Sequence, residues 1–272
     1  MRRGRPVLYF HGLPGSRREA LLVDPPARKA GARLIAAERP GYGRSTFQPR
    51  RRLNDWPCDI EQLADALKLE RFAVLGVSGG GPYALACARA LPDRVTSAGV
   101  VCGLGPLTDR ALRGSMRWLP RTALYLAEKA PLLLDAVYGQ PLTWLTRAGS
   151  SLPLRLLAYR LGEPDRSVML RPDTLAALMQ SLREAFRQGP GGAREDARIL
   201  GGQWGFRLHD IRTRVHLWHG DADIIVPPLH ARYLDASLPR SQLALVAGEG
   251  HFSLPIKHRL EILEIILRAD AW

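Results

Sequence analysis

Phe72-Ala73-Val74-Leu75-Gly76-Val77-Ser78-Gly79-Gly80-Gly81-Pro82-Tyr83-Ala84-Leu85-Ala86 is the stretch that decides the fold. Its first residues form a short apolar run, which predicts a buried strand, and its last residues have high helix propensity. Pro82 suits a first helical turn, where its missing N–H is not needed. Between strand and helix, the pattern Gly-x-Ser-x-Gly predicts a sharp turn that projects the Ser78 hydroxyl. Such a turn brings positions 76 and 80 so close to other backbone that only small residues fit.

The competing interpretation of this stretch is a glycine-rich turn that binds phosphate. That interpretation requires Gly-x-x-x-x-Gly-Lys-Ser/Thr, or Gly-x-Gly-x-x-Gly followed at the correct distance by an acidic residue for ribose. Neither pattern occurs in the chain. We therefore predict that Ser78 is a nucleophile.

Strand and helix patterns alternate on both sides of this turn. Short apolar runs predict strands at 7–10, 33–37, 72–75, 95–102, 215–218 and 242–246, with helices at 16–30, 55–69, 82–90 and 228–237 and a last helix that ends near residue 267. This order predicts an α/β fold with a mostly parallel sheet flanked by helices. Functional residues of such sheets gather at the carboxyl ends of the strands.

Residues 106–208 break the alternation. They contain helical pieces at 112–119, 122–138, 142–149, 153–161 and 173–188, and Gly189-Pro190-Gly191-Gly192 predicts a flexible loop. We predict a core formed by residues 1–105 and 209–272, with 106–208 inserted as a helical cap before the strand that carries the catalytic aspartate. Some apolar side chains of the cap are expected to line a pocket over Ser78.

The partners of the serine are predicted from two loops that follow the cap. Asp223 follows the strand at 215–218, and His251 follows the strand at 242–246. They give the order Ser, Asp, His, in which the histidine acts as base and the aspartate orients it. Asp221 competes with Asp223, and Asp109 is a third candidate; we favour Asp223 and assign Asp221 to a turn.

Seven histidines compete for the role of base. Only His251 combines a loop at a strand end, a preceding glycine and the required chain order. His11 and His219 are predicted to support loops, and His216 to lie within a strand. His230 and His258 are predicted on outer helices, and His209 at the exit of the cap. An oxyanion hole is expected from two backbone N–H groups, those of Gly79 at the helix start and Leu13 after the first strand.

With these residues the chain resembles the α/β-hydrolase superfamily, in the branch with His-Gly-x-Pro near its start. The matching pieces are His11-Gly12-Leu13-Pro14-Gly15-Ser16, Arg39-Pro40-Gly41-Tyr42-Gly43-Arg44-Ser45, the Ser78 turn, His219-Gly220-Asp221-Ala222-Asp223 with Pro227, and Gly248-Glu249-Gly250-His251. The resemblance implies a triad of Ser78, Asp223 and His251 and a cap at 106–208. The chain departs from the family pattern in two places. The usual hairpin before the first strand does not appear in the sequence, so either this member lacks it or the chain is incomplete at its N-terminus, and an exposed sheet edge is then expected. The other departure is Glu38, where aspartate is more usual.

Composition excludes several other classes. The net charge is +13, but the arginines are scattered and no nucleic-acid-binding motif accompanies them, so we expect no nucleic-acid partner. Three cysteines without metal-ligand spacing predict small buried residues and no metal site. No apolar run is long enough for a signal peptide or a membrane span. A cytoplasmic protein without stable membrane association is expected, and a homo-oligomer stays open.

The expected activity is that of a serine hydrolase without a cofactor, which cleaves a carboxylic ester, thioester or lactone through an acyl-enzyme on Ser78. Its substrate would be a small molecule with an apolar portion. One alternative uses the same triad for hydrolysis of carbon–carbon bonds, perhydrolysis or lyase chemistry. The other is a ligand-binding protein without catalysis. The sequence does not identify the substrate.

Overall fold

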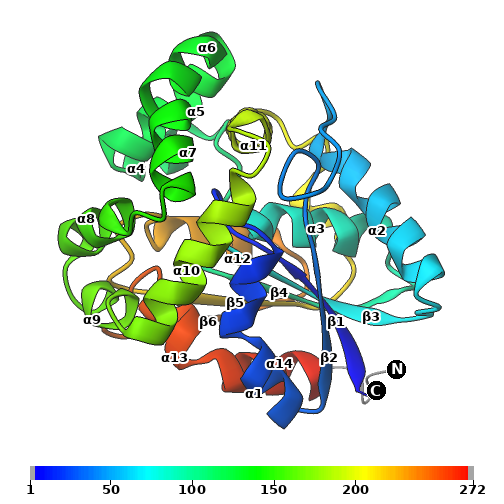
Figure 1. Ribbon diagram of the computed structural model, residues 1–272. Coiled ribbons are helices and arrows are strands. Elements are labelled where there is room, and N and C mark those ends of the chain that lie inside the picture. The colour runs from blue at the N-terminus through cyan, green and yellow to red at the C-terminus, as the bar shows by residue number, and fades with distance from the viewer. Residues whose placement is uncertain (1–3, 269–272) are drawn as a thin grey trace.

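The structure, a computed structural model, describes residues 4–268 and is built around one sheet (Figure 1). Its six strands are parallel and lie in the order β2-β1-β3-β4-β5-β6. They are β1 (Arg5–Phe10), β2 (Ala32–Ala37), β3 (Phe72–Val77), β4 (Val95–Val101), β5 (Val215–Gly220) and β6 (Ser241–Val246). Each predicted strand is present. Within residues 4–268 no strand lies beyond β2, which forms one edge of the sheet.

Both faces of the sheet are covered by helices, because successive side chains of a strand point to opposite faces. In β1, Val7 and Tyr9 pack in a cluster with α1 (Asp24–Lys29) and α14 (Arg259–Arg268). Leu8 and Phe10 pack on the other face with α2 (Trp56–Ala66), α3 (Gly81–Ala90) and α12 (Leu229–Ser237). Every residue of β3 is buried, as expected for the centre of a parallel sheet.

The first helical region differs from the prediction of one helix at 16–30. It is split into the 3₁₀ helix η1 (Arg17–Leu22) and α1. Pro25 and Pro26 stand in the first turn of α1, and since proline has no N–H, the preceding helix cannot continue through them. Ser16 caps η1 as predicted, since its hydroxyl accepts from the N–H of Arg18 at 3.2 Å.

Between β4 and β5 all regular structure of the described chain is helical. The elements are α4 (Arg110–Ser115), α5 (Trp118–Lys129), α6 (Pro131–Leu134), the π-helical turn η4 (Asp135–Gly139), α7 (Gln140–Arg147), α8 (Leu152–Leu161), α9 (Asp165–Met169), α10 (Pro172–Ala185), α11 (Gly191–Gly201) and the 3₁₀ turn η5 (Leu208–Asp210). In Figure 1 the helices α4 to α7 stand clear of the sheet, while α10 and α11 lie against the core.

The prediction of a loop at 189–192 holds for Gly189 and Pro190, which lie outside the helices, but is wrong for the last two residues, because Gly191 begins α11. Glycine is a poor helix former, so the sequence pattern indicated a loop. Its place in the helix has a packing reason. A Cβ on Gly192 would lie 2.6 Å from the carbonyl oxygen of Gly41, so glycine lets α11 approach the core loop.

The structure also bears on the predictions made for the cysteines and for membrane-spanning helices. Cys87 and Cys102 are buried as predicted, but Cys58 is exposed. No helix within residues 4–268 is long and apolar enough to cross a membrane.

Candidate active site

Ser78 stands on the sharp turn between β3 and α3. Its backbone φ is +53°, in the left-handed region that costs a non-glycine residue energy. The turn is tight, because a Cβ on Gly76 would lie 2.2 Å from the carbonyl oxygen of Gly80, and a Cβ on Gly80 would lie 2.2 Å from that of Phe10. The glycine requirement predicted from the sequence therefore has a direct steric cause.

Three predicted site residues form one chain of hydrogen bonds. The His251 Nε2 lies 2.9 Å from the Ser78 Oγ, and the His251 Nδ1 lies 2.7 Å from the Asp223 Oδ2. The Asp223 Oδ1 accepts from the backbone N–H groups of Ile225 and Val226, both at 2.9 Å. Asp223 is thus fixed by its own loop, and one of its oxygens is directed at the imidazole.

The electrostatic surroundings of His251 suit a proton acceptor. Burial alone would lower the pKa of His251, but the Asp223 carboxylate outweighs it, so the pKa of His251 is raised. Burial alone would raise the pKa of Asp223, but His251 and His219 outweigh it, and the pKa of Asp223 is held well below its usual range. The aspartate therefore stays charged and the imidazole can accept a proton.

The competing candidates lie elsewhere. Asp221 accepts from the N–H of Gly248 at 2.7 Å as part of a turn, and Asp109 caps α4 by accepting from Ala111 and Leu112. Among the histidines, His230 lies on α12, a helix that flanks the sheet, as predicted. It is fully buried there, and its Nδ1 accepts from the N–H of Gly105 at 3.1 Å.

The two predicted oxyanion-hole donors are neighbours. A Cβ on Gly79 would lie 3.3 Å from the Leu13 backbone nitrogen. The loop that carries Leu13 is held by Arg39, whose guanidinium donates to the carbonyl oxygens of His11 at 2.7 Å and Gly12 at 2.9 Å. Arg39 thereby fixes the peptide group that contains the Leu13 N–H and the peptide group before it.

Arg39 is in turn held by Asp196 of α11, a residue that sequence analysis missed. Its carboxylate is fully buried and accepts from Arg39 at 2.6 Å and Arg51 at 2.8 Å, and from the hydroxyls of Tyr42 at 2.9 Å and Tyr83 at 2.6 Å. Burial would raise the pKa of Asp196, but the arginines outweigh it and lower the pKa to about 2. The helical segment therefore contributes a charge that supports the oxyanion loop.

A second missed residue, Asp165 of α9, holds the loop of the histidine. It is 3% exposed and accepts from the backbone N–H of His251 at 3.0 Å and from those of Phe252 and Ser253 at 2.9 Å each. A Cβ on Gly250 would lie 2.5 Å from Asp165, so the glycine before the histidine makes room for this carboxylate. Nothing in the local sequence around Asp165 indicated this contact.

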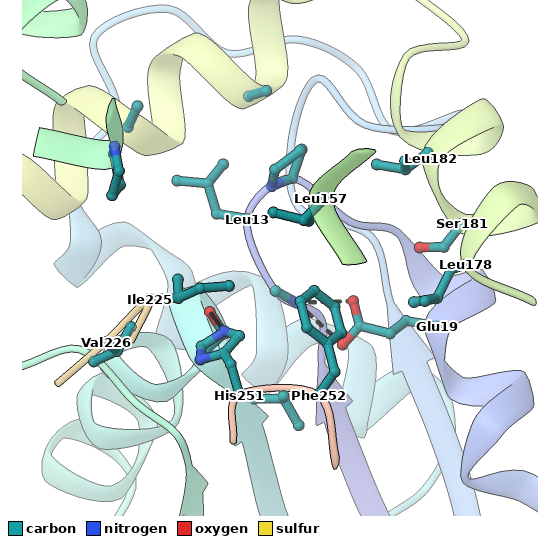
Figure 2. Close-up of a pocket in the computed structure, with 18 of the residues that line it drawn as sticks. Leu13, Glu19, Leu157, Leu178, Ser181, Leu182, Ile225, Val226, His251 and Phe252 are labelled. Carbon is teal, nitrogen blue, oxygen red and sulfur yellow. Dashed lines mark hydrogen bonds between the residues drawn. The ribbon is translucent and has the colours of Figure 1, made fainter. Parts of the chain in front are cut away.

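A cavity of about 530 Å³ lies over Ser78 and is lined mainly by apolar side chains. Figure 2 shows Leu13, Ile225, His251 and Phe252 around this space, with the leucines of α8 and α10 opposite them. Glu19 also borders the cavity. Apolar groups of a ligand can pack against such a wall.

One group of possible metal ligands occurs in the described part of the chain. The ligand atoms of Cys102, Asp223 and His251 lie within 4.8 Å of one another. Asp223 and His251 already bond to each other, and burial raises the pKa of the Cys102 thiol well above its usual value. The thiolate that a metal needs is therefore disfavoured.

Comparisons with known proteins agree with this fold. A protein from Caulobacter segnis, provisionally named carbamate hydrolase RutD, is 27% identical over 202 residues, which are 73% of this chain and 66% of that protein. The proline iminopeptidase of Lactobacillus delbrueckii subsp. bulgaricus is 24% identical over 90% of this chain and 83% of its own. The crystal structure of a bromoperoxidase from Bacillus anthracis has a TM-score of 0.73 at 22% identity and covers 98% of this chain and 91% of that one.

The family comparison covers most of the chain. The model of the family described as alpha/beta hydrolase fold matches residues 5–257. This range contains Ser78, Asp223 and His251 and the helical segment between β4 and β5. The chain belongs to the α/β-hydrolase fold family.

Proposed function

We propose that the protein is a serine hydrolase that cleaves a carboxylic ester, thioester or lactone through an acyl-enzyme on Ser78. The observation that carries this proposal is the unbroken hydrogen-bond chain from Ser78 through His251 to Asp223. In this proposal the segment 106–208 is the cap, and the substrate is a small molecule whose apolar part occupies the cavity over Ser78.

Acylation starts when the Ser78 Oγ attacks the carbonyl carbon and its proton moves to the His251 Nε2. The imidazolium that results is stabilised by the Asp223 carboxylate. The carbonyl oxygen becomes an oxyanion and accepts from the N–H groups of Leu13 and Gly79. When the tetrahedral intermediate collapses, the bond to the leaving group breaks, and the leaving group takes the proton from His251.

Deacylation repeats these steps with water. His251 accepts a proton from the water as its oxygen attacks the acyl carbon, and the same two N–H groups bind the second oxyanion. Collapse releases the carboxylic acid and returns the proton to the Ser78 oxygen. The positions of both loops matter in each step, which gives Asp165 and Arg39 supporting roles.

Family membership and the names of the relatives, a carbamate hydrolase and a proline iminopeptidase, support an enzyme of the hydrolase class. The choice of ester, thioester or lactone is ours and rests on the site. The cytoplasmic location and the absence of a cofactor stay predictions.

The test is covalent labelling with a fluorophosphonate probe, which reacts with activated serines. We expect one probe per chain on Ser78 in the native protein and none in the Ser78→Ala variant. A His251→Ala variant with a native unfolding curve should label far more slowly, because it retains the serine but lacks the base. Native protein that stays unlabelled at high probe concentration would refute the proposal.

Labelling alone does not identify the bond that is cleaved, so a panel of short and medium-chain esters, thioesters and lactones follows. Release of acid and alcohol or thiol in equal amounts supports hydrolysis. Cleavage of a carbon–carbon bond in a diketone, with no ester turnover, would favour the alternative use of the same triad.

A further inference from the structure

Two acidic side chains border the cavity over Ser78 without a part in the proposed mechanism, Glu19 and Asp135. Glu19 stands in η1, and its carboxylate accepts from the hydroxyl of Tyr9 at 2.6 Å and from the backbone N–H of Gly12 at 3.1 Å. It borders the cavity, as Figure 2 shows, and is partly exposed there, although it lies in the interior of the protein. A buried carboxylate that faces an apolar cavity is costly unless a donor or a cation meets it.

Glu19 is close to the reacting atoms. A Cβ built on Gly12 would lie 3.6 Å from the Glu19 Oε2 and also 3.6 Å from the Ser78 Cβ. Room for the carboxylate comes from Gly15, where a Cβ would lie 2.6 Å from the same oxygen. A substrate whose carbonyl carbon is at Ser78 therefore places its neighbouring atoms within reach of Glu19.

The contacts of Glu19 leave its charge without a paired cation. Both direct donors, Tyr9 and Gly12, are neutral, and among residues 4–268 no lysine, arginine or histidine lies within 4.0 Å of its carboxylate. Arg39 and His251 contribute positive charge near Glu19, but Arg39 is engaged by Asp196 and by the carbonyl oxygens of His11 and Gly12, and His251 is engaged by Asp223 and Ser78. Burial accordingly raises the pKa of Glu19 against the opposing effect of its donors.

The other polar groups of the cavity wall do not compete for a cation. Arg194 pairs with the Oδ2 of Asp135 and so neutralises this carboxylate, although the Oδ1 has no hydrogen-bond partner in the chain from residue 4 to residue 268. The Ser181 hydroxyl bonds to Ser16. Arg259, the second arginine that borders the cavity, donates to the carbonyl oxygen of Leu22 at 2.9 Å, and most of the remaining wall is apolar. A cationic group in the cavity would therefore find one favourable position, against Glu19, where the low dielectric strengthens the attraction.

We propose that Glu19 is a specificity-determining residue that selects acyl substrates with an organic ammonium group beside the scissile carbonyl. This inference rests on the proposed function and narrows its substrate class. The ammonium group belongs to the acyl part, as in an α-aminoacyl ester, or to the leaving group, as in a choline ester. In either position the same ammonium group would meet the carboxylate of Glu19, and the experiment distinguishes the two positions.

The experiment uses two pairs of substrates in which only the charge differs. The acyl pair is the phenyl ester of α-aminobutyrate and that of α-methylbutyrate. The leaving-group pair is choline butyrate and its analogue with carbon in place of nitrogen. We expect the native protein to favour the ammonium member of one pair by about tenfold to 100-fold in kcat/KM, the range of a charge-assisted contact.

The decisive variant is Glu19→Gln, which keeps an acceptor for Tyr9 and Gly12 but removes the charge. Its preference, measured as the ratio of the two kcat/KM values within a pair so that a common loss of activity cancels, should fall to within about threefold. Glu264→Gln, an exposed change of the same type on α14, should keep the native preference. A native protein without preference in either pair, or a Glu19→Gln variant that retains it, would overturn the inference.

Failure of the proposed function gives a different result. If the neutral esters are hydrolysed without an ammonium preference, the serine hydrolase stands and only the role of Glu19 is lost. If no ester is hydrolysed and Ser78 is not labelled, the proposed function is wrong. Binding of choline butyrate and its carbon analogue to Ser78→Ala, measured by calorimetry, then decides the role of Glu19 without turnover, because equal Kd values overturn it.

Discussion

Replacement of Asp165 by asparagine tests whether the helical segment holds the catalytic histidine. The carboxylate is buried and accepts three backbone N–H groups, two through Oδ1 and that of His251 through Oδ2. An asparagine keeps two of these bonds if its amide oxygen takes the place of Oδ1. Its NH₂ group then faces the N–H of His251, so that two donors meet and neither has an acceptor.

The magnitude follows from this loss. One buried donor without a partner costs about 1–3 kcal/mol. With a urea m-value of about 2 kcal/mol per molar, the midpoint of unfolding should fall by roughly 0.5–1.5 M. The opposed donors also push the His251 backbone away from Asp165, and a shift of about 1 Å at a catalytic group costs on the order of 100-fold in rate. We therefore expect kcat/KM to fall by about tenfold to 100-fold.

The assay combines urea unfolding with the rate of fluorophosphonate labelling of Ser78, measured well below the unfolding transition. Asp93→Asn is the control, because Asp93 is exposed and precedes β4, at the opposite end of the parallel strands from the site. It should change stability by less than about 0.5 kcal/mol and leave labelling unchanged. An Asp165→Asn protein with native stability and a native labelling rate would refute the argument that Asp165 positions His251.

Three further predictions concern the rest of the site. The pKa of His251 is raised and the base must be neutral, so kcat/KM should fall as the pH drops through a pKa above 6.5. In Asp223→Asn this acidic decline in kcat/KM should move to lower pH, and the rate at neutral pH should fall on the order of 10⁴-fold. Gly76→Ala forces a methyl group against backbone and should lower the free energy of unfolding in urea by about 1–3 kcal/mol. Gly114→Ala in α4 meets nothing within 4 Å and should raise it by up to about 1 kcal/mol. Equal effects of the two changes would contradict the steric argument. Asp196→Ala leaves two buried guanidinium groups without their carboxylate and should lower the unfolding free energy by about 3–5 kcal/mol, and a loss below about 1 kcal/mol would show that the network contributes little.

The residues that could be predicted from the sequence share a local signal. Ser78 stands in a turn whose glycines are required by contacts with nearby backbone, and Asp223 and His251 each follow an apolar strand. Because parallel strands end at one edge of the sheet, the order of strands and loops is enough to bring these three side chains together. Their hydrogen bonds are the geometric outcome of that order.

Predictions failed where local pattern and packing disagree. The region 16–30 has the apolar content of one helix, but two prolines divide it. The glycines at 191 and 192 resemble a loop, yet they start α11, because only glycine allows that helix to approach Gly41. In both cases two adjacent residues outweighed the propensity of their neighbours.

The sequence by itself determined the fold class, the strand order along the chain and the three residues of the hydrogen-bond chain. Only the tertiary structure decided which polar side chains support them. Asp165 and Asp196 are two of many acidic residues in helices, and their partners lie 86 and 157 positions away in the chain. Helical periodicity tells which face of a helix is apolar but not which loop that face meets, so the supporting charges and the carboxylate of Glu19 in the cavity become visible only when the chain is folded.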